Sequence, residues 1–406
     1  MPGPDLDSIL AGAAERFGTP AYIYLTDAIE TRLTELRASL GAWFDVSYAM
    51  KCNPNPALLA WLAPRVDLID VSSGGEFALA CAAGWQAQRA SFTGPAKRDD
   101  ELRAVIAGGL GELVIESPRE ARAADRIAAE LGVVQPVLIR LAPDRVPKGF
   151  GDHMAGRPSP FGIDIEDAPV ALPQILALPN LHVIGLHIYS GTQCLRPDAI
   201  AENWRIYMQI FRETCATHDL MPQKLVFGAG LGIPYHPGDT ALSLPQIAAD
   251  IGPDLNAFRN EPRFSRTKLV LELGRFLVGE AGYFVTRVIS TKSSRGSRLA
   301  ICDGGMNAHL AASGNFGMVL RRNYVIHKIG GGDEVEKVDI SGPLCTSIDK
   351  IGGAVLLPPL AEGDLIAIHT SGAYGPTASP LHFISHPTPR EILVEGAQAR
   401  DVTRIA

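Results

Sequence analysis

The sequence predicts an α/β fold, a (β/α)8 TIM barrel followed by an antiparallel β domain. From Phe44 to Gly274, apolar and β-branched runs bounded by turn residues alternate with helical stretches. Such alternation indicates parallel strands joined by right-handed crossovers. Eight strand–helix units over roughly 230 residues suit a TIM barrel. After Gly274 the pattern changes to alternating β-like stretches separated by Gly and Pro, which is typical of an antiparallel domain.

Eight strands are expected in the barrel, which we place at residues 28–268 with the last strand at its end. These strands are Phe44–Ala49, Val66–Val71, Arg89–Thr93, Glu112–Glu116, Pro136–Leu141, His182–Ile188, Lys224–Gly228 and Lys268–Leu273. The segments between them have the pattern of amphipathic helices, as in Pro118–Leu131. A doubly wound open sheet is the alternative, but no G-x-G-x-x-G follows the first strand.

The second domain is expected at residues 269–406, with the N-terminal segment 1–27 joining the two domains. Its expected strands are Tyr283–Ser290, Leu299–Cys302, Glu336–Ile340 and Asp364–Ile368, with little helix between them. The short run Ala21–Leu25 precedes the barrel. We expect it to pair into the β domain.

Composition excludes several classes of protein. At 406 residues, with 46% hydrophobic and 20% charged residues, the chain is an ordinary soluble protein of two domains. The net charge of -7 argues against nucleic-acid binding. No secretory signal and no apolar run of about 18 residues is visible, so we expect a cytoplasmic protein without membrane contact. The six cysteines are scattered, without metal-binding spacing, and indicate reduced thiols.

Lys51 ends an apolar, aromatic run, and Asn53-Pro54-Asn55-Pro56 then stops the strand. A lysine at the carboxyl end of a buried strand loses water, which lowers its pKa and makes it a competent amine nucleophile toward an aldehyde. An exposed lysine at a strand end is the alternative for this stretch taken alone.

The residues at the other strand ends help to decide whether Lys51 is a nucleophile or an ordinary exposed lysine. In a TIM barrel, the catalytic residues lie at the carboxyl ends of the strands. Later strand ends carry Asp70–Glu76, His187–Gly191 and Phe227–Gly232, and their glycine segments offer unobstructed backbone N–H groups that suit a phosphate. Glu272 and Arg275 stand together at another strand end, where a phosphorylated cofactor with a ring nitrogen would use both. A lysine for an aldehyde, a phosphate cradle and a carboxylate for a pyridinium together describe pyridoxal 5'-phosphate.

Nearly the whole chain resembles the fold-type III pyridoxal-phosphate decarboxylases, which include ornithine, arginine and diaminopimelate decarboxylases and have an alanine-racemase-like architecture. Tyr48-Ala49-Met50-Lys51 resembles their Schiff-base lysine motif, which implies that Lys51 holds the cofactor. The resemblance implies that His187 stacks on the cofactor ring and that Ser190 contacts its phosphate. Gly228-Ala229-Gly230-Leu231-Gly232 matches the phosphate loop, with alanine at the middle glycine position.

Glu272-Leu273-Gly274-Arg275 resembles the family's E-P-G-R, with leucine replacing proline. The resemblance implies that Glu272 pairs with the pyridine nitrogen and that Gly274 and Arg275 also belong to the cofactor site. Ser371-Gly372-Ala373-Tyr374-Gly375 matches a motif whose tyrosine reaches the phosphate.

Gly342–Asp349 resembles a segment donated across a dimer interface, in which Cys345 is the acid that protonates the carbon left by carbon dioxide. A free thiol is a reasonable proton donor because its ordinary pKa is about 8.5. Ordinary packing in the β domain is the alternative for Cys345. The resemblance thus implies a homodimer with shared active sites, in which Lys51, His187 and Cys345 are the catalytic residues.

The expected substrate-binding residues are Phe316, Thr346 and Asp349. Diaminopimelate decarboxylases follow D-G-G-M-N with an arginine and a tyrosine for the distal carboxylate. Here the arginine is missing from the segment after Asn307 and Phe316 stands near the tyrosine position, while Thr346 replaces the acidic residue that follows the cysteine. A free distal charge would lack its counter-charge, and an unpaired buried charge is costly.

The segments around these positions look most like exosortase-A-associated decarboxylases and the butirosin-pathway enzyme that acts on carrier-bound glutamate. That likeness implies removal of the α-carboxylate of an amino acid whose distal end is masked or tethered to an acyl carrier protein. The alternatives are a diaminopimelate-type decarboxylase, an amino-acid racemase on the same fold, and a non-catalytic homologue. No metal is expected.

Overall fold

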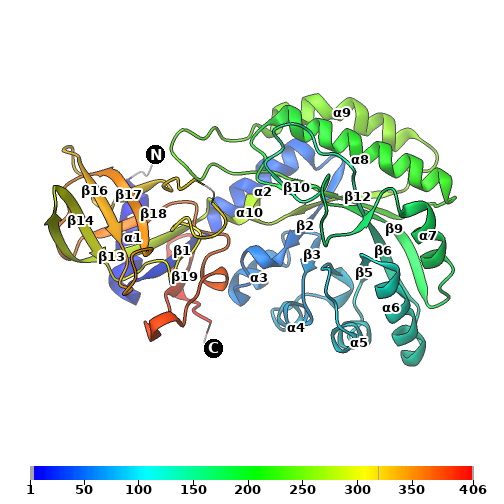
Figure 1. The fold of residues 1–406 in the computed structure, drawn as a ribbon, viewed down its shortest axis with the longest axis horizontal. Coiled ribbons are helices and arrows are strands. Elements are labelled where there is room, and N and C mark those ends of the chain that lie inside the picture. The colour runs from blue at the N-terminus through cyan, green and yellow to red at the C-terminus, as the bar shows by residue number, and fades with distance from the viewer. Residues whose placement is uncertain (1–3, 319, 405–406) are drawn as a thin grey trace. The chain divides into compact units, whose positions relative to one another are not determined.

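The computed structural model describes residues 4–318 and 320–404 (Figure 1). The first three residues of the N-terminal segment, Val319 and the last two residues of the expected β domain lie outside this range. The chain divides into two compact units, and each is described by itself. The barrel unit comprises residues 34–233 and 241–274, and the β unit comprises the described part of 1–33 with residues 234–240 and 275–404. The boundary expected between residues 268 and 269 stays a prediction.

Eight parallel strands form the barrel, which confirms the predicted fold class. They are β2 (Phe44–Ala49), β3 (Leu68–Val71), β4 (Ala90–Phe92), β5 (Glu112–Ile115), β6 (Gln135–Ala142), β9 (Leu181–Ile188), β11 (Lys224–Gly228) and β12 (Lys268–Leu273). They follow one another around the ring in chain order, and the pairing of β5 with β6 closes it. The alternative of an open, doubly wound sheet is therefore wrong. A short strand, β8 (Ile163–Asp164), extends the sheet beside β6.

Helices cover the outside of the barrel (Figure 1). They are α2 (Thr26–Leu40), α3 (Pro56–Leu62), α4 (Gly74–Ala82), α5 (Asp99–Ala107), α6 (Pro118–Leu131), α7 (Ala168–Leu176), α8 (Pro197–Thr217) and α9 (Leu244–Asn260). Local sequence sets their ends. The side chain of Ser117 accepts a hydrogen bond from the backbone of Glu120 at the start of α6, and Gly132 ends that helix in the left-handed conformation.

Branched apolar side chains fill the barrel interior. Val114, Leu138, Val226 and Val270, from four different strands, form one buried cluster. Interior layers of this kind make a TIM barrel a packed core and not a pore. The space available for chemistry therefore lies at the ends of the strands.

The β unit holds a mostly antiparallel sheet. Its strands are β1 (Ala21–Leu25), β13 (Gly282–Ser294), β14 (Ser297–Cys302), β15 (Ile326–Lys328), β16 (Glu336–Ser341), β17 (Lys350–Leu357), β18 (Leu365–Ile368), β19 (Arg390–Glu395) and β20 (Gln398–Asp401). The expected pairing of β1 into this unit is confirmed, since β1 lies antiparallel to β13 and parallel to β19. The prediction omitted α1 (Pro4–Phe17), whose Leu10, Ala13 and Ala14 pack against this sheet. Within the two described ranges, no helix combines the length and the hydrophobicity of a membrane span.

Candidate active site

Lys51 lies in a short 3-10 turn (Met50–Cys52) that directly follows β2. Its Nζ atom is 3.9 Å from Oε1 of Glu272, which stands near the carboxyl end of the neighbouring strand β12. The Lys51 side chain is 41% exposed. The expected loss of water is therefore not seen, because Lys51 sits on the turn beyond the strand and not within the strand itself. An amine in this place is accessible to a ligand that enters the barrel mouth.

Glu272 is a buried, ionised carboxylate. Its Oε2 atom is 2.9 Å from Nε2 of His187, and both side chains are at most 4% exposed. Burial alone would raise the pKa of Glu272. The hydrogen bond from His187 and the positive charges of Lys51, His187 and Arg140 outweigh burial and lower that pKa to about 2. A carboxylate that stays charged at neutral pH suits a protonated ring nitrogen.

A second buried carboxyl group, that of Asp70, has its pKa shifted in the opposite direction from that of Glu272. Asp70 lies near the carboxyl end of β3 and is almost fully buried. It accepts a hydrogen bond from Thr93, and its Oδ2 atom has no partner among the described residues. Burial and the charge of Glu272 raise the pKa of Asp70 well above its usual value. Two carboxyl groups whose pKa values are pushed apart are typical of a catalytic site. Asp70 stands at a strand end in the sequence, but no motif there indicated a role for it.

The loops after β9 and β11 share the phenol of Tyr207 as a hydrogen-bond partner, in addition to direct backbone bonds from Cys194 to Gly230 and Gly232. The backbone N–H of Ser190 donates to the Tyr207 hydroxyl at 2.9 Å, and that hydroxyl lies 3.4 Å from the carbonyl oxygen of Gly228. Gly230 has a φ of +72°, and a Cβ atom there would collide with the ring of Phe150. Only glycine therefore fits this turn without strain. Tyr207 projects from α8, and the sequence offered no motif for it.

Two buried polar side chains in these segments have few hydrogen-bond partners among the described residues. Nδ1 of His187 forms no hydrogen bond with any of them, and the fully buried Ser190 hydroxyl lies close to the Tyr207 hydroxyl that the Ser190 N–H also contacts. Buried polar atoms are normally satisfied, so the unpartnered imidazole nitrogen at the strand ends indicates a missing ligand. An anionic oxygen would satisfy the hydroxyl of Ser190. With Glu272 ionised beside Lys51, these residues fit the phosphate and the ring nitrogen of pyridoxal phosphate.

Arg140, like Asp70 and Tyr207, was not predicted as a site residue. It lies on β6 directly across from His187 on β9, and its guanidinium is 3.0 Å from the carboxylate of Glu116. Its charge centre lies 6.0 Å from the ring centroid of Tyr189, and the Lys51 ammonium lies 5.8 Å from the same ring. An arginine inside an apolar strand is rare unless it is paired, and this is the signal that could have revealed it.

Cys345 belongs to the β unit, in the turn between β16 and β17, and its thiol is exposed. Asp349 shapes this turn. One of its carboxylate oxygens accepts the N–H of Met306 at 2.6 Å, and the other accepts the N–H of Leu344 at 2.8 Å. These bonds give Asp349 a structural role, and its contact with substrate stays a prediction. Thr346 follows Cys345 and is partly exposed.

The remaining predicted residues of the β unit gather around one tyrosine. The Arg275 guanidinium lies 5.0 Å from the ring centroid of Tyr374, and the ring of Phe316 lies 6.2 Å from it. Tyr374 has a φ of +54°, which is unusual for a residue other than glycine. Strained backbone of this kind clusters at functional sites. Gly274 belongs to the barrel unit, where a Cβ atom would press on Cys52.

Comparison with known proteins decides the family. The family described as pyridoxal-dependent decarboxylase, pyridoxal binding domain, matches residues 26–279. This chain belongs to the pyridoxal-dependent decarboxylases. Its cofactor is pyridoxal phosphate, and its reaction class is that of a carboxy-lyase acting on an amino acid. The resemblance seen in the sequence is confirmed.

Individual relatives cover almost the whole chain. The L-glutamyl-(BtrI acyl-carrier protein) decarboxylase of Niallia circulans is 34% identical over 95% of this chain and 90% of its own length. The diaminopimelate decarboxylase of Aquifex aeolicus is 30% identical over 95% of this chain and 89% of its own. Among solved structures, diaminopimelate decarboxylase from M. jannaschii has a TM-score of 0.86 and 25% identity, over 96% of this chain and 90% of its own.

Proposed function

We propose that this decarboxylase removes the α-carboxylate of an amino acid whose distal end is neutral, conjugated or carried on an acyl carrier protein. One observation carries the proposal: the segment from Ala308 to Phe316 has no charge at neutral pH. It contains no Arg, Lys, Asp or Glu. Its one titratable side chain, His309, is fully buried, and burial lowers the pKa of His309 to about 3.

The consequence is energetic. A substrate with a free distal carboxylate or ammonium would place that charge in a closed site without a counter-charge from this segment. An unpaired buried charge costs several kcal/mol, which is roughly a thousandfold or more in specificity. The relative from Niallia circulans, whose name specifies glutamate on a carrier protein, supports a tethered substrate.

The side chains divide the work by their chemistry. When bound, pyridoxal phosphate supplies an aldehyde that condenses with amines and a ring that accepts electrons. We assign the amine to Lys51, the counter-charge for the ring nitrogen to Glu272, and contact with the ring face to His187. Ser190 and the loop Gly228–Gly232 would hold the phosphate through hydroxyl and backbone N–H groups.

We assign the final proton to Cys345, whose exposed thiol is free to approach a ligand. We further propose that it acts in a site shared by two copies of the chain, together with Arg275 and Tyr374 at the phosphate. Phe316 and Thr346 would line the distal end of the substrate. Their lack of charge agrees with a masked or tethered group.

A panel of substrates tests the proposal with one enzyme preparation. We expect poor release of carbon dioxide from free ornithine, lysine and diaminopimelate, and efficient release from amidated or carrier-loaded amino acids. A kcat/KM of about 10⁴ M⁻¹s⁻¹ or more on free diaminopimelate or ornithine would contradict the masked-substrate proposal. Loss of substrate chirality without carbon dioxide release would favour the racemase alternative.

A further inference from the structure

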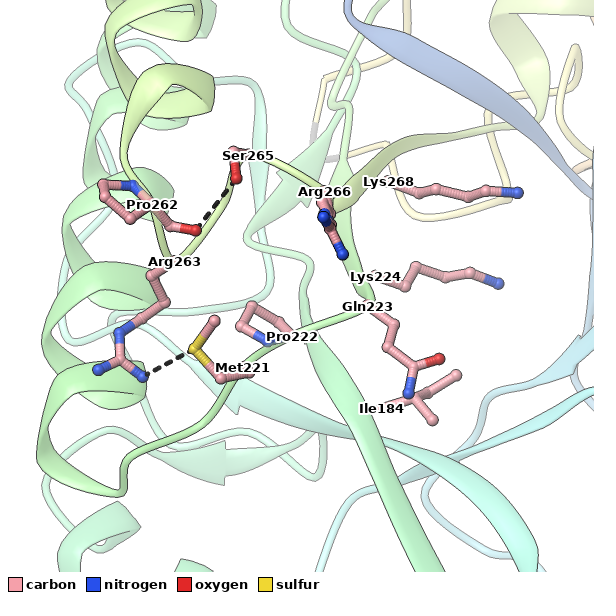
Figure 2. A pocket seen from close by; sticks show the side chains of 10 residues that line it. All are labelled: Ile184, Met221, Pro222, Gln223, Lys224, Pro262, Arg263, Ser265, Arg266 and Lys268. Atoms are coloured by element: carbon pink, nitrogen blue, oxygen red, sulfur yellow. Dashed lines mark hydrogen bonds between the residues drawn. The ribbon is translucent and has the colours of Figure 1, made fainter.

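A cavity of about 780 Å³ opens at the amino ends of β11 and β12 (Figure 2). Two turns form it, Met221–Gln223 before β11 and Pro262–Arg266 before β12, together with Ile184 of β9. Lys224 and Lys268, the first residues of β11 and β12, complete the lining. Lys51 and Glu272 stand at the carboxyl ends of their strands, so this cavity lies at the opposite end of the barrel. Glu272 is four positions along β12 from Lys268, or about 13 Å at the usual strand rise.

Cations dominate the lining. Lys224, Arg263, Arg266 and Lys268 line the cavity, and none of the lining residues is acidic. Figure 2 shows Lys224 and Lys268 extending side by side, as expected from their direct pairing between β11 and β12. In a chain with a net charge of -7, this concentration of positive charge is local and unusual.

Two of these four charges have acidic partners outside the lining. Lys224 forms an ion pair with Glu112, and Arg263 lies 3.3 Å from the carboxylate of Asp219. Arg266 and Lys268 are exposed, and neither side chain forms an ion pair or hydrogen bond with a described residue. About two positive charges therefore remain uncompensated at this cavity.

Hydrogen bonds connect the two turns that line the cavity. The Thr267 hydroxyl donates to the carbonyl of Pro222 at 2.7 Å, and the N–H of Lys268 donates to the carbonyl of Gln223 at 2.9 Å. The guanidinium of Arg263 donates to the carbonyl of Leu220 at 2.6 Å. These bonds hold the backbone of both turns, so little backbone ordering is needed when a ligand binds.

We propose that this cavity binds a small organic dianion, such as a phosphate monoester or a dicarboxylate, separately from the catalytic site. Its volume falls in the range of about 300–1,000 Å³ that is typical of small-molecule sites. Arginine and lysine suit phosphate and carboxylate groups. The apolar side chains of Ile184, Met221, Pro222 and Pro262 give the carbon skeleton of the ligand a surface to contact.

The proposal does not depend on the substrate proposed above. A carrier protein that delivers an amino acid to Lys51 has to reach the carboxyl ends of the strands, whereas the cavity lies at their amino ends. A pocket of this volume also suits a small molecule better than the face of a protein.

Calorimetry on the cofactor-loaded enzyme tests the site, because bound cofactor fills the catalytic phosphate site. The probes are glycerol 3-phosphate, succinate and inorganic phosphate. We expect wild type to bind the first two, and the double variant Arg266→Gln/Lys268→Gln to bind them about tenfold or more weakly. The matched control, Lys292→Gln/Arg295→Gln, removes the same charges from exposed positions of the β unit and should bind as wild type does.

Two results would overturn the proposal. One is that wild type binds neither organic anion at millimolar concentration, or binds inorganic phosphate alone. The other is that the pocket variant and the control bind equally well. Thermal unfolding of both variants identifies any loss that comes from misfolding, and in that case the single variant Lys268→Gln decides by the same comparison.

Discussion

Nε2 of His187 lies 2.9 Å from Oε2 of Glu272, and this pair is buried at the carboxyl ends of β9 and β12. His187 contacts Glu272 through Nε2. Its other ring nitrogen, Nδ1, has no hydrogen-bond partner among the described residues. His187 therefore supports the charge of Glu272 in the absence of a ligand. Removing the negative charge of Glu272 should therefore lower the rate of the reaction more than it lowers the stability of the fold.

We expect Glu272→Gln to lower kcat by about 10² to 10³, a range typical of losing one group that stabilises developing charge. The amide keeps the shape of the side chain but no longer balances a protonated ring nitrogen. Cofactor content, measured by absorbance after dialysis, should change much less than kcat. An unchanged kcat in a fully loaded variant would show that Glu272 does not act on the ring.

His309 should make stability depend on pH. Its Nδ1 accepts the N–H of Ala312, and its Nε2 lies 2.9 Å from the Ser371 hydroxyl, so the folded protein holds a neutral imidazole. Its pKa falls from 6.5 to about 3 on folding. Below pH 6.5 the unfolded chain binds a proton that the folded chain does not. The contribution of His309 to stability is therefore complete above pH 6.5 and is lost as pH falls toward 3.

The expected loss is about 1.4 kcal/mol per pH unit within that window. Urea unfolding at pH 7 and pH 5.5 should show a smaller pH dependence for His309→Gln than for wild type. Glutamine keeps a donor toward Ser371 but does not titrate. Equal pH dependence of the two proteins would mean that His309 is protonated in the folded state.

The sequence predicts the barrel well because its strands are short, apolar and regularly spaced. Phe44–Ala49 and Lys224–Gly228 coincide with β2 and β11 for this reason. β17 was missed because Gly352 and Gly353 interrupt it with residues of low strand propensity. The helix α1 was missed because its apolar side chains are buried by a sheet formed mostly from residues far along the chain.

Prediction of the site was limited in a similar way. Lys51 and Glu272 stand in motifs at strand ends, so sequence alone points to them. Arg140 and Tyr207 contribute through contacts with other strands and loops, which no local motif records. Lys51 is exposed because it lies on a turn just beyond the end of its strand. The sequence pattern does not locate strand ends to within one or two residues, so it could not predict this exposure.

A shared active site predicts recovery of activity on mixing two inactive variants. Lys51→Ala and Cys345→Ala each remove one proposed catalytic group, and we assign these groups to different copies of the chain. Random exchange leaves half of the dimers with one intact site, so the mixture should regain about a quarter of wild-type activity. No recovery, under conditions where labelled subunits demonstrably exchange, would contradict the shared site.

Tyr207 should act on cofactor affinity through the loops that it joins. Its hydroxyl accepts the N–H of Ser190 and lies against the carbonyl of Gly228, so Tyr207→Phe removes this bridge and leaves the direct backbone bonds between the loops in place. Loss of such a buried hydrogen bond costs about 1–3 kcal/mol, and we expect the Kd for pyridoxal phosphate to rise about tenfold. The matched control for this prediction is Tyr24→Phe, which removes a buried hydrogen bond to Glu391 within the β unit.

Both variants should lose thermal stability. Only Tyr207→Phe should release cofactor more readily, because only Tyr207 contacts the loops after β9 and β11. Equal cofactor affinity in the two variants would reduce Tyr207 to a packing residue of α8.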